Sequence, residues 1–356
     1  MADFLSTLKN LPPVNHFPKN SSFVHLFKEI TIFKKKKAEE NCIRFFDRRT
    51  FFTVYGEDAI LIAKTYNKTT GTLKHLGESQ IPYQTIQSRQ MSGMLKDLIE
   101  KKHSFEIWSN KGHRWECVQK GSPGNFENFD YEGEGDSGSV IMAVSIGKQD
   151  NNVQIGVAYV DQITCTFGIS EFVDSEKLCN LEIATVQLGA REVLVQLQET
   201  RFPVSVVRQV FDKCDVAITE QKQKAFKTNN IEQDLRRLVS SEAHPNLSFQ
   251  LDMRLAMSSL AALISFLELL NDDTNHGAFN IVTFDLKNYM RLDAAAMQAL
   301  NLVPTPTDAN KSMNLFGRLN SCKTAMGSRK LMQWIKQPLL DEKEISNPTV
   351  FFYLAF

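Results

Sequence analysis

The sequence predicts an α/β protein with an α+β first part, a helix-covered sheet in the middle and a mainly helical last part. Up to about residue 122, short aromatic and β-branched runs alternate with helical patterns. Between residues 139 and 219, β-rich runs precede and then alternate with helix candidates, as in a sheet covered by helices. From Ile231 onward the apolar spacing is mainly helical.

The first part is predicted to begin its sheet with a hairpin. Aromatic and β-branched residues at 42–46 and 51–55 flank a polar turn at 47–50. Glu57 and Asp58 then favour a helix over 59–66, because acidic residues stabilise the first turn of a helix. Further strands are expected at 71–76 and 103–109, a helix over 91–101, and a polar, Gly-rich linker over 121–138.

The middle part is predicted to hold five strands and two helices before the helical end. The helix expected over 253–270 has apolar residues at helical spacing and is interpreted as a packed core helix, not a membrane anchor. The expected strands are 139–146, 153–160, 162–167, 192–196 and 215–219, and the expected helices are 175–184 and 202–212.

Composition narrows the class of protein. With 356 residues and 42% hydrophobic composition, the chain has enough apolar residues for two or three domains. No N-terminal stretch resembles a signal peptide, and no window approaches the ~20 apolar residues of a membrane-spanning helix. The six cysteines are widely spaced without a Cys-x-x-Cys pair, which indicates neither a disulfide framework nor a zinc site. We expect an intracellular protein with reduced thiols.

The neutral net charge conceals an asymmetry along the chain. Residues 1–122 hold 20 Lys and Arg against 12 Asp and Glu, a net charge of +8. Residues 123–356 hold 21 against 29, a net charge of −8. A basic block of this kind is typical of a partner with a phosphate backbone, and it places any nucleic-acid contact in the first third. A merely solubilising surface explains the surplus equally well.

Several long segments resemble the MutS family of mismatch-repair proteins. They include Leu315-Phe-Gly-Arg-Leu-Asn-Ser-Cys-Lys-Thr-Ala-Met-Gly-Ser-Arg329, the run 290–302, and Ile155-Gly-Val-Ala-Tyr-Val-Asp161. The resemblance implies a mismatch-binding-like α+β domain over 1–122, a ribonuclease-H-like α/β connector over 123–289, and the start of an all-α lever domain over 290–345. Residues 346–356 depart from the family pattern as an apolar, uncharged tail. We interpret that tail as a truncated product or mistaken gene-model end, with a genuine short isoform as the alternative.

The predicted hairpin carries the main candidate site. In mismatch-reading relatives a Phe-x-Glu motif stands where this chain has Phe51, Phe52 and Thr53, the aromatic ring stacking on a base and the carboxylate bonding to it. Threonine in place of glutamate argues against direct mismatch reading and favours the MutS homologue 2 type of subunit. That type has Gly-Asp where this chain has Arg49 and Thr50. If the family resemblance is set aside, strand alternation alone explains two adjacent phenylalanines as one core-facing and one outward residue.

Basic residues near the hairpin are candidates for phosphate contacts, which give affinity without sequence specificity. A solvated loop accounts for the lysine run among them equally well. The candidates are Lys34, Lys35, Lys36, Lys37, Arg44, Arg48 and Arg49.

Two further motifs suggest enzymes and are weighed against simpler interpretations. Gly135-Asp-Ser-Gly-Ser139 resembles the segment around a chymotrypsin-like serine, but no histidine stands in a matching context to serve as base. A flexible connection around Ser137 is the favoured interpretation. Asp161 ends a predicted strand where a ribonuclease-H-like fold often holds a metal. No companion carboxylates are evident, so we interpret Asp161 as a strand end.

The resemblance implies a role in DNA mismatch repair. The expected partners are duplex DNA with mismatches or small loops, a second MutS homologue as heterodimer partner, and MutL-type proteins, with the nucleus as location and no membrane. No Gly-x-x-x-x-Gly-Lys-Ser/Thr loop occurs, so we expect a non-enzymatic chain without a cofactor, ATP and magnesium belonging to the family's ATPase domain. The alternative is a protein-interaction module, in which the connector docks repair factors and competes with the parent protein.

Overall fold

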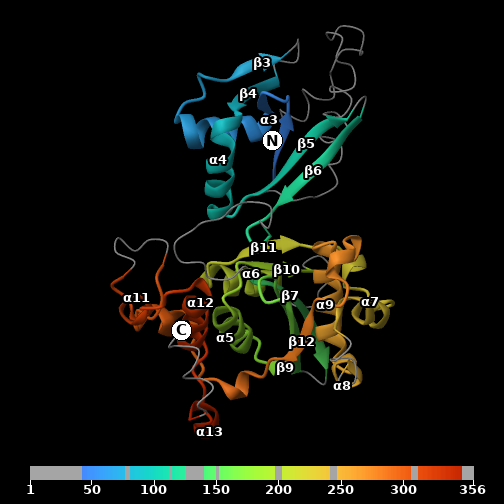
Figure 1. Cartoon of the computed structure of the whole chain (residues 1–356), viewed down its shortest axis with the longest axis vertical. Coiled ribbons are helices and arrows are strands. Elements are labelled where there is room, and N and C mark those ends of the chain that lie inside the picture. The colour runs from blue at the N-terminus through green and yellow to red at the C-terminus, as the bar shows by residue number, and fades with distance from the viewer. Residues whose placement is uncertain are drawn as a thin grey trace. The chain divides into compact units, whose positions relative to one another are not determined.

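The computed structural model describes residues 42–76, 81–111, 114–125, 140–149, 152–196, 203–240, 247–305 and 312–346 (Figure 1). The chain divides into two units, Met1–Phe129 and Asp130–Phe356. Each has its own six-stranded sheet. The predicted fold class is confirmed, because mixed α/β sheets in both units are followed by helices.

Unit 1 is a sheet with the strand order β3-β4-β2-β1-β5-β6 and two helical segments packed on one face. Strand alternation directs Ile43, Phe45 and Val54 toward these helices, where they meet Leu95 and Leu98 in one buried cluster. The elements are β1 (Cys42–Asp47), β2 (Phe51–Tyr55), α3 (Gly56–Ile62), the π-helix η2 (Ala63–Asn67), β3 (Lys74–Leu76), β4 (Ile81–Gln87), α4 (Ser88–Glu100), β5 (Ser104–Lys111) and β6 (Arg114–Gly121).

The predicted hairpin is confirmed by the antiparallel pairing of β1 and β2, with Phe46 opposite Thr53. The helix after it begins at Gly56, three residues earlier than predicted, with Glu57 and Asp58 in its first turn. Strands β4 and β6 were not predicted.

Unit 2 contains a sheet with the order β11-β10-β7-β8-β9-β12. Strands β7, β8 and β9 form an antiparallel meander, while β10, β11 and β12 each join in parallel. The strands are β7 (Val140–Gln149), β8 (Asn152–Asp161), β9 (Thr166–Asp174), β10 (Glu192–Val195), β11 (Ala217–Glu220) and β12 (Asn280–Thr283).

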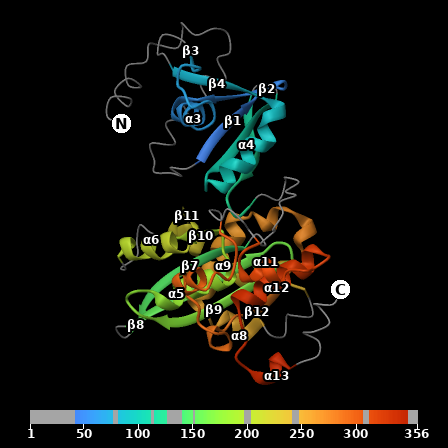
Figure 2. The ribbon, with the colours of Figure 1, turned by 90° about the vertical axis from the view of Figure 1, so that its left-hand side faces the viewer.

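Helices cover both faces of this second sheet (Figure 2). Apolar residues of α5 (Cys179–Leu188) and α6 (Val204–Lys213) share a buried cluster with one face. On the other face, α9 (Arg254–Phe266) packs across β7 and β8 beside α7 (Ile231–Leu238). The smaller segments are η3 (Gln223–Phe226), α8 (Leu247–Leu251), η5 (Leu269–Asn271), η6 (Asp273–Asn275) and η7 (Leu286–Asn288).

Helix α9 confirms the predicted core helix, ending at Phe266 before a left-handed Glu268. Its N-terminus is held by a carboxylate from the sheet: Glu171 Oε2 accepts from the backbone N–H groups of Leu255 (3.1 Å) and Ala256 (3.4 Å). This contact satisfies two amides that have no partner inside the helix. In the described ranges of the chain, every helix is too short or too polar to cross a membrane.

The strand predicted over 162–167 is wrong. Residues 162–165 form a turn, and β9 instead extends from Thr166 to Asp174. The cause is Asp161, whose Oδ1 accepts from the N–H groups of Ile163 (3.0 Å) and Thr164 (3.4 Å) and so turns the chain. The interpretation of Asp161 as a strand end is confirmed.

The helices of the last part begin at capping side chains: Asp293, Asn314, Thr324 and Asp341 each accept from a backbone N–H group two or three residues ahead. This part joins the end of α5 through two glutamines. Gln187 Nε2 donates to the Met290 carbonyl (2.6 Å), and Gln337 Nε2 donates to the Gln187 carbonyl (3.1 Å). The helices are α10 (Ala294–Ala299), α11 (Leu315–Leu319), α12 (Ala325–Lys336) and α13 (Glu342–Ile345).

Candidate nucleic-acid interface

The tip of the β1–β2 hairpin is a tight turn with an unusual residue. The Arg48 N–H group donates to the Phe51 carbonyl (2.9 Å), which leaves Arg49 and Thr50 as the two loop residues. Arg49 has a φ of 72°, in the left-handed region that favours glycine. The Asp47 carboxylate accepts from the Arg49 N–H group (2.6 Å) and supports this conformation. The turn therefore projects an exposed arginine from the sheet.

The three residues of the predicted recognition triplet have different environments. Phe51 is exposed (38%) beside the tip, whereas Phe52 is half-buried against the helix-side core. Thr53 is buried, and its Oγ1 donates to the Phe46 carbonyl on β1 (3.4 Å). The expectation of one outward and one core-facing phenylalanine is confirmed. At Thr53 the side chain lies inside the sheet and offers no group to an outside ligand.

Arg48 is held by an aromatic cluster on the sheet face opposite α3 and α4. Its Nη2 donates to the Tyr55 hydroxyl (3.2 Å), and its guanidinium carbon lies 5.0 Å from the centroid of Trp115. Phe46 packs edge-on against both rings, with centroids 5.6 Å from Tyr55 and 5.5 Å from Trp115. The cluster fixes the base of the hairpin, so Arg48 positions the tip more than it offers a free charge.

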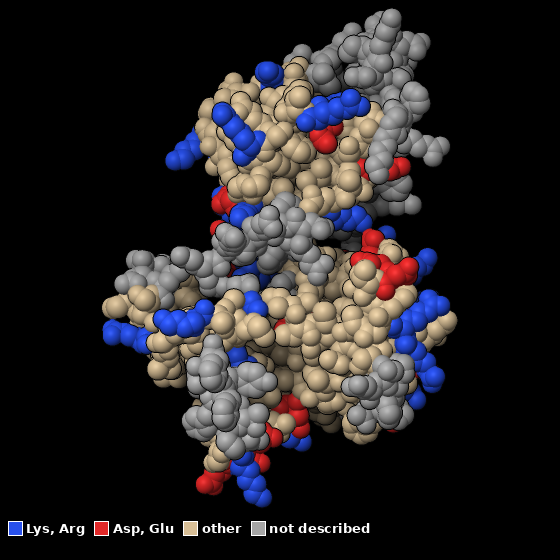
Figure 3. All heavy atoms as spheres, viewed as in Figure 1, with Lys and Arg blue, Asp and Glu red and all other residues tan. Residues whose placement is uncertain are grey.

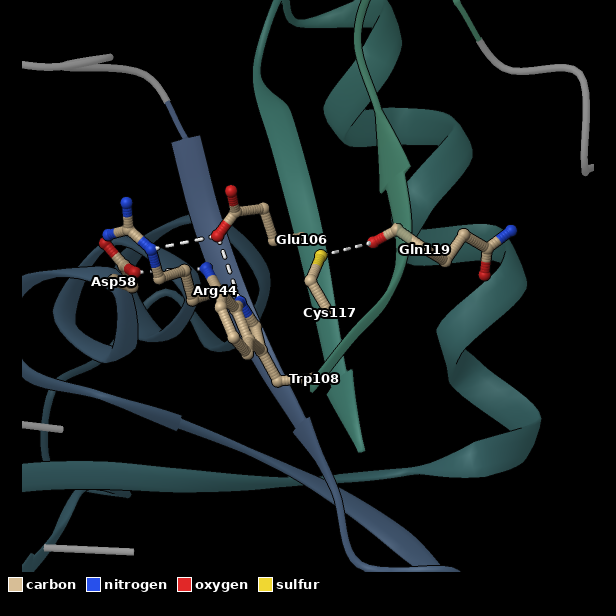
Figure 4. Close-up of polar contacts among 6 residues, drawn as sticks. All are labelled: Arg44, Asp58, Glu106, Trp108, Cys117 and Gln119. Carbon is tan, nitrogen blue, oxygen red and sulfur yellow. Dashed lines mark hydrogen bonds and ion pairs between the residues drawn. The ribbon is translucent and has the colours of Figure 1, made fainter. Parts of the chain in front are cut away.

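Arg44 points into an ion pair within unit 1 (Figure 4). Its Nε lies 3.1 Å from Glu106 Oε2, which also accepts from Trp108 Nε1 (3.0 Å). The backbone N–H group of Arg44 donates to Asp58 Oδ2 (3.1 Å). Glu106 thus compensates the charge of Arg44 before any phosphate does. No local sequence pattern indicates this pair, because the partners stand 62 residues apart.

The remaining predicted site residues divide between the hairpin tip and undescribed parts of the chain. Lys34–Lys37 and Ser137 lie outside the described residues. Arg49 and Phe51 are the predicted residues that the structure brings together at one exposed tip.

Unit 1 has further exposed cations besides the predicted phosphate-contact residues. On the face shown in Figure 3, Lys and Arg side chains are scattered over this unit. The only sequence signal for them was the net charge of +8, because they are dispersed rather than clustered in a motif. They include Lys64, Lys68, Lys74, Arg89 and Lys120.

Metal chemistry has no candidate cluster within the described ranges. No group of three or more His, Cys, Asp or Glu side chains lies close enough there to hold an ion.

Comparison with known protein families finds matches for three successive parts of the chain. Residues 29–130 match MutS domain I, 139–280 match MutS domain II, and 295–347 match MutS domain III. The predicted family resemblance is confirmed across both units.

Curated relatives agree with these matches. DNA mismatch repair protein msh-2 of Neurospora crassa is 39% identical over 319 residues, covering 86% of this chain and 34% of its own length. MSH2 of Arabidopsis thaliana is 36% identical (89% and 35%), and MSH2 of Saccharomyces cerevisiae is 31% identical (90% and 36%). The chain spans about a third of the length of these relatives. This chain belongs to the MutS family of DNA mismatch repair proteins.

Proposed function

We propose that this chain acts in DNA mismatch repair as a DNA-contacting part of a MutS-type heterodimer that does not itself read the mismatch. The observation that carries the proposal is the hairpin tip, where Arg49 and Phe51 are exposed while Thr53 is buried and bonded to Phe46. A cation and an aromatic ring at an exposed turn suit a DNA backbone and an adjacent sugar or base. Thr53, which stands where mismatch-reading relatives have a glutamate, has no carboxylate to bond to a base.

The basic composition of the first part of the chain supports contact with the phosphate backbone. Its net charge of +8 over residues 1–122 provides a salt-sensitive attraction that does not depend on sequence. Base-specific contacts require polar groups aimed at base edges, and Thr53 supplies none. We therefore expect similar affinity for matched and mismatched duplexes in the absence of a partner subunit.

The partners in the proposal are those of a MutS-type assembly. A second MutS homologue would read the mismatch, and MutL-type proteins would receive the signal. This chain has no phosphate-loop motif. ATP and magnesium would therefore bind elsewhere in the assembly. The relatives come from fungi and a plant, whose chromosomal DNA is nuclear, and we place the action in the nucleus.

Fluorescence anisotropy with labelled duplexes tests the proposal. The expected result is weak binding that disappears with added salt and differs little between a matched duplex and a single mismatch. Arg49→Gln combined with Phe51→Ala should weaken both alike, whereas Lys148→Gln with Lys177→Gln, exposed on unit 2, should not. No binding at low salt, or a strong mismatch preference of the isolated chain, would contradict the proposal.

The competing protein-docking function makes a different prediction. A docking connector should retain a MutL-type partner in an extract treated with nuclease. Retention that survives nuclease, together with an absence of DNA binding, would replace the DNA-contacting function by the docking function.

A further inference from the structure

The segment of unit 2 between β11 and α7 is positively charged, although unit 2 lies in the acidic part of the chain. Residues 221–230, which we call the basic run, read Gln221-Lys-Gln-Lys-Ala-Phe-Lys-Thr-Asn-Asn230 and contain three lysines but no acidic residue. Residues 123–356 as a whole have 21 basic against 29 acidic residues. The basic run is therefore a cationic segment in an acidic part of the chain.

The backbone of the basic run is fixed to the core of unit 2. The Gln221 N–H group donates to the Val195 carbonyl of β10 (2.9 Å), and the Ala225 N–H group closes the turn of η3 on the Lys222 carbonyl (2.9 Å). Phe226 is buried (6%), and its carbonyl accepts from Ser258 Oγ of α9 (2.7 Å). Because the backbone is already ordered, binding here costs less conformational entropy than binding to a free loop.

The three lysines are exposed, and none of them is paired with a carboxylate that the structure describes. Among the residues that the structure describes, Lys222, Lys224 and Lys227 form no ion pair. The carboxylates that flank the run have other partners: Glu220 lies 2.6 Å from Arg208, and Glu232 lies 2.8 Å from Arg236. The run therefore presents three cations that no described carboxylate neutralises, which favours an anionic ligand.

The other side chains of the basic run indicate the class of ligand. Gln223, Thr228, Asn229 and Asn230 are exposed and can donate hydrogen bonds, while the single large apolar residue, Phe226, is buried. Protein partners usually bury an aromatic or aliphatic anchor at the centre of the contact. Phosphate backbones are bound by Lys charges together with amide and hydroxyl donors. The basic run has exposed lysines with amide and hydroxyl donors, and it has no exposed apolar anchor.

We propose that the basic run is a second nucleic-acid contact that binds the phosphate backbone of duplex DNA without sequence preference. It lies in unit 2, within the residues that match MutS domain II, and not in the hairpin of unit 1, so it goes beyond the proposed function. The binding is electrostatic and polar, with Lys222, Lys224 and Lys227 as the cations.

Lysine acetylation of the full chain, read by mass spectrometry with and without a short DNA duplex, tests the site directly. We expect the duplex to protect Lys222, Lys224 and Lys227 at low salt and to lose this protection at high salt. Lys148, Lys177 and Lys287, exposed on the same unit, should react equally in both samples. Equal reactivity of all six would overturn the proposal, as would protection by polyglutamate but not by DNA, which would indicate an acidic protein partner.

A pair of charge-matched variants gives an independent measurement. Neutralising Lys222, Lys224 and Lys227 to glutamine should reduce the slope of log affinity against log salt by about 2–3, at about 0.9 per phosphate contact. The control neutralises Lys148, Lys177 and Lys287 and should leave the slope unchanged. Equal slopes in the two variants would contradict the proposal. Hairpin variants that leave binding intact would disprove the unit 1 contact without affecting this one.

Discussion

Gly156 of β8 lies so close to the first turn of α9 that a Cβ atom on it would stand 2.2 Å from the carbonyl carbon of Leu255. The helix backbone thus rests almost directly on the strand backbone. Ser259 Oγ, one turn further along α9, donates to the Gly156 carbonyl (2.8 Å) and holds the two together. Glycine is required here by space, not by a positive φ.

Substitution of Gly156 by alanine should therefore lift α9 from the sheet. We expect a loss of about 3 kcal/mol in the free energy of unfolding, because the added methyl group meets backbone atoms that cannot rotate away. Urea unfolding measures this loss. Gly147→Ala is the matched control: its Cβ would stand 3.1 Å from the flexible end of the Leu255 side chain, so a smaller loss is expected. Equal losses in both variants would contradict the explanation.

Arg49→Gly should stabilise unit 1. A left-handed conformation costs a non-glycine residue about 1–2 kcal/mol, and glycine gives back roughly 0.5–1 kcal/mol through its greater freedom in the unfolded chain. The expected net gain is about 0.5–1 kcal/mol in thermal or urea unfolding. Arg49→Asn should give part of this gain, since asparagine tolerates the left-handed region. A less stable Arg49→Gly variant would show that the arginine side chain contributes a compensating contact.

Alanine variants of the two hairpin phenylalanines should have different effects, one on DNA binding and the other on stability. Phe51→Ala removes an exposed ring and should change the free energy of unfolding by less than about 0.5 kcal/mol while weakening duplex binding. Phe52→Ala opens space beside the helix-side core and should cost about 2–3 kcal/mol. Parallel urea unfolding and anisotropy on both variants provide the comparison. A Phe51→Ala variant with unchanged affinity would remove the ring from the contact.

Lys336 should give unit 2 a distinct pH dependence. Burial, and to a smaller extent the nearby charge of Arg191, together lower the pKa of Lys336 to about 8. The unfolded pKa is near 10.5, so the unfolded chain binds more protons between about pH 8 and 10.5, and stability rises over that window. Below pH 8 both states are protonated and the cost of the buried charge is present in full.

Comparison with Lys336→Met isolates this contribution from other groups that titrate at high pH. The difference in unfolding free energy between the variant and the parent chain should favour the variant by about 1–3 kcal/mol at pH 7 and shrink toward pH 10.5. A difference that does not change with pH would show that Lys336 is solvated in the folded state.

Local patterns predicted much of the fold where the sequence itself carries the cause. The hairpin followed from two β-prone runs around a polar turn, and α9 from apolar residues at helical spacing. Strand β4 was missed because Pro82 and alternating polar residues weaken its intrinsic preference, and pairing with β2 and β3 on both sides overrides that preference. Strand β12, four residues long, forms only by pairing with β9.

For the candidate site, the sequence predicted where the hairpin tip lies but not the contacts that its arginines make. The position of the hairpin tip followed from the family motif, and the exposure of Phe51 from strand alternation. The pairing of Arg44 with Glu106 and the stacking of Arg48 on Trp115 join segments far apart in the sequence. No local pattern encodes such contacts, because they depend on strand order in the folded sheet.

The order of segments in unit 2 has a consequence for its synthesis. Strand β9 cannot pair with β12 until Asn280–Thr283 has left the ribosome. The end of α5 cannot form its hydrogen bond with Gln337 until that residue, 150 residues after Gln187, has been synthesised. During translation the antiparallel meander of β7, β8 and β9 must therefore persist with an open edge. Slow codons or chaperone capture around this interval would influence the yield of folded protein more than the same delay placed after residue 340.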